Sequence, residues 1–326
     1  MKKVLKCLGM MALVAVAFTS CKKENEETSI SISSESMITV DEDRAYLSEA
    51  TGKTHFEIGD RVMVFNISEE TPTMSNCAVY EAVEEGSHVR FVNSGYGDAA
   101  QDALDGGYYA YYPFVEPFEN IISELPDGEN KAKFHVQPVQ TYREDKVSLN
   151  DLYMAGYSDA SNLSAAIAEF PMQNIMGVLR LMPYEAARRT VTSIEIVDTH
   201  FHLSGWVELI IPEVNATELK NLFNSYSEST DWMNAANVIK NRLGYNVTDA
   251  GYSITLNVPG GVQLGDTKAS TPKFNIVLRP LALSQGFHII FTFDDGSVKD
   301  VDLSGYTDIC IKPNVRRNQG LNLDSF

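Results

Sequence analysis

Cysteine, basic residues and long apolar runs are all scarce in this chain of 326 residues. Four cysteines are too few for the disulfide framework of a small secreted domain. Lysine and arginine number 26 against 44 acidic residues, which gives a formal net charge of −18 at pH 7. So acidic a protein repels nucleic acid, and we expect no nucleic-acid partner. No apolar run reaches the roughly 18 residues that a membrane-spanning helix needs.

Motifs of enzymes and metal centres are missing as well. The chain contains no Gly-x-Ser-x-Gly, no His-Glu-x-x-His and no phosphate-binding glycine loop. His200 and His202 would face the same side of a strand and could chelate a metal, but no further ligand follows at a recognised spacing. Two polar residues on a solvated face are the simpler interpretation. We expect no enzymatic activity, cofactor or metal, with a secreted hydrolase of unrecognised site as the alternative.

What is present begins with an export signal. Basic residues at positions 2, 3 and 6 precede an apolar stretch of 11 residues, 8–18, and the small Ser20 precedes Cys21. This order is typical of a bacterial lipoprotein signal, so we predict a signal peptide over residues 1–20 and lipid on Cys21. A plain secretory signal with an incidental cysteine is the alternative. Residues 22–27 (KKENEE) resemble a sorting signal for the outer face of the outer membrane, or form a solvated tether.

Two cysteines remain after the signal and the lipid site. Cys77 and Cys310 could pair in an oxidising compartment. The favoured interpretation is two small core residues.

Short alternating segments at intervals of about ten residues predict an all-β protein of sandwich type. Residues 28–44 alternate serine with isoleucine and are predicted to form one half-buried strand that ends at Arg44. A pause in the pattern near residues 184–189 predicts a domain boundary. One helix is predicted over residues 229–243, where apolar side chains recur at helical spacing.

A run of tyrosines is the most functional-looking cluster. Residues 108–112 read YYAYY, and strand alternation places Tyr109 and Tyr111 on one face. At least one face of this strand must be core. The other could form a platform on which sugar rings stack, so Tyr109 and Tyr111 are candidate ligand contacts beside the simpler interpretation of core packing.

The order of several motifs resembles the fimbrillin-like lipoproteins of type V pili and related surface adhesins. The matching elements are Cys21 and the following segments: 56–65 (FEIGDRVMVF), 109–113 (YAYYP), 151–155 (DLYMA), 172–174 (MQN), 177–181 (GVLRL), Ile194 and 203–205 (LSG). The resemblance runs from residue 1 to about residue 210 and is weaker beyond.

This resemblance implies two tandem transthyretin-like β-sandwich domains, with the predicted helix inserted in the second. The expected divisions are a signal at 1–20, a lipidated tether and first strand at 21–44, and sandwiches at 45–187 and 188–326. It also implies assembly with other pilus subunits by donor-strand exchange, in which residues 29–40 leave after proteolytic cleavage between Arg44 and Ala45. An uncut surface turn at Arg44 is the alternative.

We therefore expect a structural or adhesive pilus subunit, anchored at the outer membrane by lipid on Cys21 and exposed on the surface or in the fimbrium. Its adhesion target would be a host protein or a glycan. The C-terminal segment 309–323 is a candidate donor strand, with residues 314–319 as its hinge, or it is the last strand of the second sandwich. A glycan-binding lipoprotein of a polysaccharide-uptake system is the alternative function.

Overall fold

A computed structural model of the chain describes residues 29–34, 38–41, 44–45, 55–66, 77–96, 108–114, 122–124, 130–144, 147, 152–158, 168–211, 246–283, 287–305, 309–311 and 314–326. These residues form β-strands almost throughout, which confirms the predicted all-β class. The helix predicted over residues 229–243 lies outside the described residues. Within the ranges above, no helix is long and apolar enough to cross a membrane.

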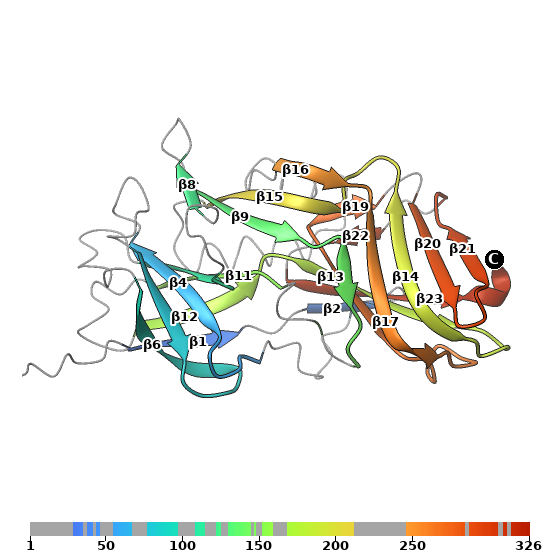
Figure 1. The fold of residues 1–326 in the computed structure, drawn as a ribbon, viewed down its shortest axis with the longest axis horizontal. Helices are drawn as coiled ribbons and strands as arrows, with labels where there is room; N and C mark the ends of the chain where they lie inside the picture. The colour runs from blue at the N-terminus through green and yellow to red at the C-terminus, as the bar shows by residue number, and fades with distance from the viewer. Residues whose placement is uncertain are drawn as a thin grey trace, which may run out of the picture.

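Seven strands close into a barrel at the left of Figure 1. They are β1 (Ser29–Ser34), β4 (Arg61–Asn66), β5 (Cys77–Ala82), β6 (His88–Tyr96), β7 (Tyr108–Tyr112), β11 (Met154–Ser158) and β12 (Ala168–Asn174). Their order around the barrel is β1-β12-β11-β7-β4-β5-β6. The expectation of two tandem transthyretin-like sandwiches is not confirmed by this closed arrangement.

Three further sheets and one two-stranded ladder make up the rest. The first runs β10 (Val139–Thr141), β17 (Ser253–Gln263), β14 (Thr190–Asp198), β20 (Phe287–Phe293) and β21 (Val298–Asp302). The second runs β18 (Phe274–Leu278), β13 (Gly177–Tyr184), β23 (Val315–Asn322), β2 (Ile38–Asp41) and β3 (Arg44–Ala45). The third runs β16 (Asn246–Gly251), β15 (Ser204–Ile211), β9 (Asn130–Val136) and β8 (Ile122–Glu124). The ladder joins β19 (Leu281–Leu283) to β22 (Ile309–Ile311), and a 3-10 helix, η3 (Leu323–Ser325), ends the chain.

Strands from both sides of the expected boundary at residues 187/188 share sheets. β9 pairs with β15, β10 pairs with β17, and β13 lies between β18 and β23. The division of the chain into units at 45–187 and 188–326 stays a prediction.

The segment predicted as one strand over residues 28–44 is divided between sheets. Its described residues form β1 in the barrel and then β2 and β3 in another sheet. The alternation did not reveal this break, because β1 (SISISS) and β2 (ITVD) both alternate apolar with polar residues. β12 and β13 also lie in different sheets, separated by Ile175 and Met176, which are both fully buried.

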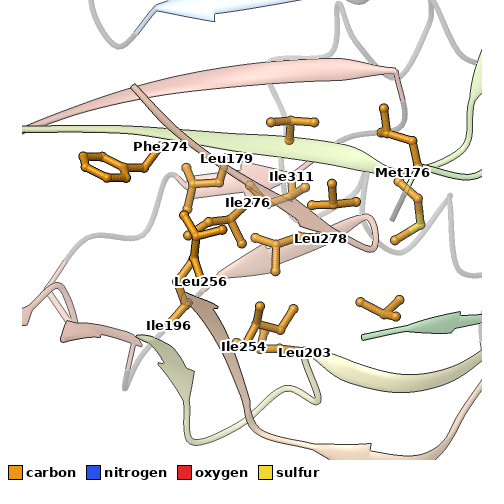
Figure 2. Close-up of a cluster of buried hydrophobic side chains, with 14 of the residues drawn as sticks. Met176, Leu179, Ile196, Leu203, Ile254, Leu256, Phe274, Ile276, Leu278 and Ile311 are labelled. Carbon is orange, nitrogen blue, oxygen red and sulfur yellow. The ribbon is translucent and has the colours of Figure 1, made fainter. Parts of the chain in front are cut away.

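The buried side chains form two clusters. The smaller one fills the barrel and contains Ile30, Ile32, Phe91, Phe170 and Met172 among others. The larger one lies between the other sheets, and Figure 2 shows part of it, with side chains from β13, β14, β17 and β18 converging on one another.

The tyrosine strand β7 contributes to both clusters. Tyr108 and Tyr112 point into the barrel, whereas Tyr109 and Tyr111 point outward into the larger cluster. The predicted alternation is therefore correct, but both faces of this strand are core. The barrel does not present this outer wall to solvent, because the larger cluster packs against it.

Candidate functional site

The candidate assembly site is the place of β1 in the barrel wall. β1 lies between two strands that follow it in the chain, β6 and β12, and is hydrogen-bonded to both. It runs antiparallel to β6, with Ile32 opposite Val89, and parallel to β12, with Ile32 opposite Phe170. Without β1, β6 and β12 would both have an unpaired edge, and the barrel would be open.

The side chains of β1 follow from its alternating sequence. Ile30 and Ile32 are fully buried inside the barrel, while Ser29, Ser31 and Ser33 are partly exposed on the outside. Burial of the two isoleucines contributes roughly 3–6 kcal/mol, at 1.5–3 kcal/mol for each. Outside the barrel, the hydroxyl of Ser31 lies 2.9 Å from Nε2 of His88 on β6. β1 is therefore held by two backbone ladders and a short apolar ridge.

The chain that follows β1 extends a second sheet. β2 runs parallel to the C-terminal strand β23, with Ile38 opposite Val315 and Asp41 opposite Asn318. β3 consists of Arg44 and Ala45 and pairs antiparallel with β2 at the edge of this sheet. The bond between Arg44 and Ala45, the predicted cleavage point, thus lies within a short edge strand rather than after the end of a single strand.

One polar contact lies at the wall of the barrel. Burial raises the pKa of Asp60 above its ordinary value, and the hydrogen bond from the hydroxyl of Tyr112 opposes this rise. Burial also raises the pKa of Tyr112, and the nearby carboxylate of Asp60 raises it further. The Tyr112 hydroxyl therefore stays protonated and acts as a donor at any ordinary pH.

The other predicted site residues have different outcomes. Cys21 lies outside the described residues, so its lipidation stays a prediction. Tyr109 and Tyr111 are each only 3% exposed, so neither ring can stack on a sugar at the surface, and the ligand-platform interpretation is wrong for this structure. Cys77 is buried in β5, and burial raises the pKa of its thiol to about 12. The side chain of Cys310 is not among those described.

The C-terminal segment is built into the fold of its own chain. β23 lies between β13 and β2, and Leu321 and Leu323 are 3% and 1% exposed. The carboxylate of Asp324 accepts a 2.8 Å hydrogen bond from the backbone N–H of Ala186, and the ammonium of Lys299 donates to the carbonyl of Phe326. The expected hinge at residues 314–319 is wrong, because most of it is strand. The other interpretation, a final strand of the chain's own fold, describes this segment.

Sequence patterns did not identify the partners of β1. The segment of β12 alternates, with Ala168, Phe170 and Met172 buried, and this pattern could have predicted a strand with one face inside a core. Its parallel pairing with β1 joins residues about 140 positions apart, and nothing in the local pattern indicates such a contact.

Comparisons with known proteins give matches to structures only. No family model matches the chain, and no curated protein matches it. One similar structure, from Bacteroides uniformis, is described as a "putative cell adhesion protein": 11% identity, 92% of this chain and 94% of that chain covered, and a TM-score of 0.49. Another is a fimbrial protein from Bacteroides ovatus, with 12% identity, 91% of this chain and 49% of that chain covered, and a TM-score of 0.40.

The tip fimbrial protein Mfa3 from Porphyromonas gingivalis is also similar, with 9% identity, 84% of this chain and 81% of that chain covered, and a TM-score of 0.29. At these identities and scores, we infer nothing about the function of this chain from the likeness. These three solved structures are described as cell adhesion and fimbrial proteins, the class that the sequence motifs of this chain resemble.

Proposed function

We propose that this protein is a structural or adhesive subunit of a cell-surface pilus, exported as a lipoprotein and assembled by strand exchange. The observation that carries the proposal is the position of β1. A short strand at the start of the described chain closes a barrel whose six other strands all follow it in the chain. A strand so placed can leave without unthreading any other element.

The chemistry of strand replacement fits this position. A donor strand from another subunit would need to supply the backbone N–H and C=O groups that β6 and β12 now share with β1. It would also need two apolar side chains, two residues apart, to fill the positions of Ile30 and Ile32. The energy lost when β1 leaves would be recovered by an equivalent strand, so that exchange needs little net driving force.

Cleavage between Arg44 and Ala45 would release β1 and β2 together. We propose that lipid on Cys21 holds the precursor at the outer membrane, and that this cut separates the folded body from its anchor. Two transthyretin-like units, divided near residues 187/188, are part of the same proposal.

The first experiment is mass spectrometry of the protein recovered from the surface of its own cells. We expect chains that begin at Ala45. If the processing protease is specific for arginine, the Arg44→Lys variant should stay uncut and keep the N-terminus of the precursor. An intact lipidated N-terminus on all the protein, filamentous fraction included, would contradict the cleavage step.

The second experiment tests whether the position between β6 and β12, once β1 has left it, can bind another strand. After cleavage at Arg44 and removal of the released segment, the protein should bind a synthetic peptide of residues 29–41, measured by fluorescence anisotropy. The same peptide with Ile30→Asp and Ile32→Asp is the matched control and should not bind, because a buried unpaired carboxylate is strongly unfavourable. Equal binding of both peptides, or of neither, would count against strand exchange.

A further inference from the structure

Exposed aromatic rings are rare in the described part of the chain. Phe201 and Tyr252 are 40% and 49% exposed, whereas all four tyrosines of β7 are buried. The imidazole of His202 lies against the ring of Tyr252, with centroids 4.4 Å apart and an angle of 51° between their planes. Phe201 directly precedes His202 in the chain, and we call Phe201, His202 and Tyr252 the aromatic cluster.

Hydrogen bonds join the two segments that carry this cluster. The backbone N–H of Asp198 donates to the carbonyl of Tyr252 at 3.0 Å, and that of Leu203 donates to the carbonyl of Gly251 at 2.8 Å. Leu203 also lies in the core cluster with Ile254 (Figure 2), which fixes the chain on either side of the rings. The side chain of Arg279 donates from Nε to the carbonyl of His202 at 2.9 Å. The rings are therefore pre-positioned, and a ligand would not have to order them.

A buried carboxylate lies next to the cluster. Asp198 is fully buried, and its Oδ1 accepts hydrogen bonds from the backbone N–H groups of His200 at 2.7 Å and Phe201 at 2.9 Å. Its other oxygen, Oδ2, has no hydrogen-bond partner among the residues that the structure describes. A buried acceptor without a donor is unfavourable, and a hydroxyl group or a water would remove that cost. Asp198 lies beside Tyr252 in the chain pairing, because its backbone N–H donates to the carbonyl of Tyr252.

We propose that the aromatic cluster is a binding site for a neutral carbohydrate. Aromatic rings offer flat apolar faces for the C–H face of a sugar, and the surrounding polar groups suit its hydroxyls. The nearby acidic groups, Asp198 and the exposed Asp249, together with the net charge of −18, disfavour an anionic sugar. This proposal is independent of how subunits assemble.

Native affinity electrophoresis tests the proposal, with the full chain run through gels that contain a neutral glucan, mannan, galactan or xylan. We expect retardation in at least one gel, and Tyr252→Ala should weaken binding by about tenfold or more. Tyr252→Phe keeps the ring and should bind as the unchanged protein does. Phe326→Ala removes another exposed aromatic side chain, 41% exposed, and serves as the matched control.

The proposal would be overturned if no neutral gel retarded the protein, or if only an anionic polysaccharide retarded it. Equal loss of binding in Tyr252→Ala and Phe326→Ala would also overturn it. If Tyr252→Phe lost as much binding as Tyr252→Ala, stacking on the ring of Tyr252 would not be the cause of binding. Phe201→Ala provides a second variant, and it should weaken binding while leaving the thermal unfolding midpoint unchanged.

Discussion

At the scale of single residues, Ile32 is central to the packing of β1 in the barrel. Its side chain is fully buried against Val89 and Phe170. We expect Ile32→Ala to lower the free energy of unfolding by about 2–5 kcal/mol, because the substitution leaves a cavity. Ser33, the next residue of the strand, is partly exposed and provides the control. We expect Ser33→Ala to change the free energy of unfolding by about 0.5 kcal/mol or less. Urea denaturation measures the free energy of unfolding of both variants. A loss in Ile32→Ala as small as that in Ser33→Ala would mean that β1 is loosely held.

Glu185 and Arg189 form an ion pair outside the barrel. The Glu185 side chain is 2% exposed, its Oε2 lies 2.7 Å from Nη2 of Arg189, and the guanidinium carbon lies 3.7 Å from the ring centroid of Phe293. Burial acts to raise the pKa of Glu185, but the hydrogen bonds from Arg189 outweigh it and lower the pKa below the ordinary 4.5.

This pair should give stability that depends on pH. A lowered pKa means that the contribution is present above the ordinary pKa of 4.5 and is lost as the pH falls through the lower folded value. We expect Glu185→Gln to reduce the free energy of unfolding by about 1–3 kcal/mol at pH 7. The difference from the unchanged protein should shrink at a pH well below 4.5. A difference independent of pH would show that the charge is not what stabilises this contact.

The tyrosines of β7 show what local pattern can and cannot predict for a residue. Alternation correctly separated Tyr109 and Tyr111 from Tyr108 and Tyr112. Alternation alone left core packing and a ligand platform open for Tyr109 and Tyr111, and the larger cluster packed outside the barrel agrees with core packing, the simpler interpretation. Conversely, the exposed ring of Tyr252 was not identified from the sequence, because a single tyrosine at the start of a strand carries no pattern.

At the scale of elements, the contact between β11 and β12 allows little room for change. A Cβ built on Gly156 would lie 2.5 Å from the sulfur of Met172 and 3.0 Å from the carbonyl oxygen of Pro171. We expect Gly156→Ala to lower the free energy of unfolding by about 1–3 kcal/mol, because this part of the barrel would be overpacked. Gly305 has nothing within 4 Å of such a Cβ, so Gly305→Ala is the control and should be close to neutral. Thermal unfolding of the two variants compares them directly.

Strands with strong alternation and clear turn residues were predicted well. The turn at residues 294–297 (DDGS) joins β20 to β21, with Gly296 at φ 79° and its N–H bonded to the carbonyl of Phe293. β16 and β19 were not predicted as strands, because β16 is largely polar in sequence and β19 is three residues long. β23 (VRRNQGLN) carries two arginines and two asparagines, and its strand conformation depends on pairing with β13 and β2 rather than on its own composition.

At the scale of the whole molecule, the two hydrophobic clusters are joined by shared strands. Met63, Val79 and Tyr111 belong to barrel strands but pack in the larger cluster. Opening the barrel would therefore expose part of the other core. We expect a single cooperative thermal transition, with calorimetric and van't Hoff enthalpies that agree. Two well-separated transitions would contradict this coupling and would support units that fold independently on either side of residues 187/188.

The parallel pairing of β2 with β23 has a consequence for mechanical load. In this ladder Ile38 lies opposite Val315 and Asp41 opposite Asn318, so tension on the two chain ends pulls the strands along each other in opposite directions. All hydrogen bonds of the ladder then bear the force at once, instead of breaking one after another. A protein held at one end and pulled at the other should resist in this shear geometry. Single-molecule stretching through both termini should need more force than stretching a chain that begins at Ala45 and lacks β2.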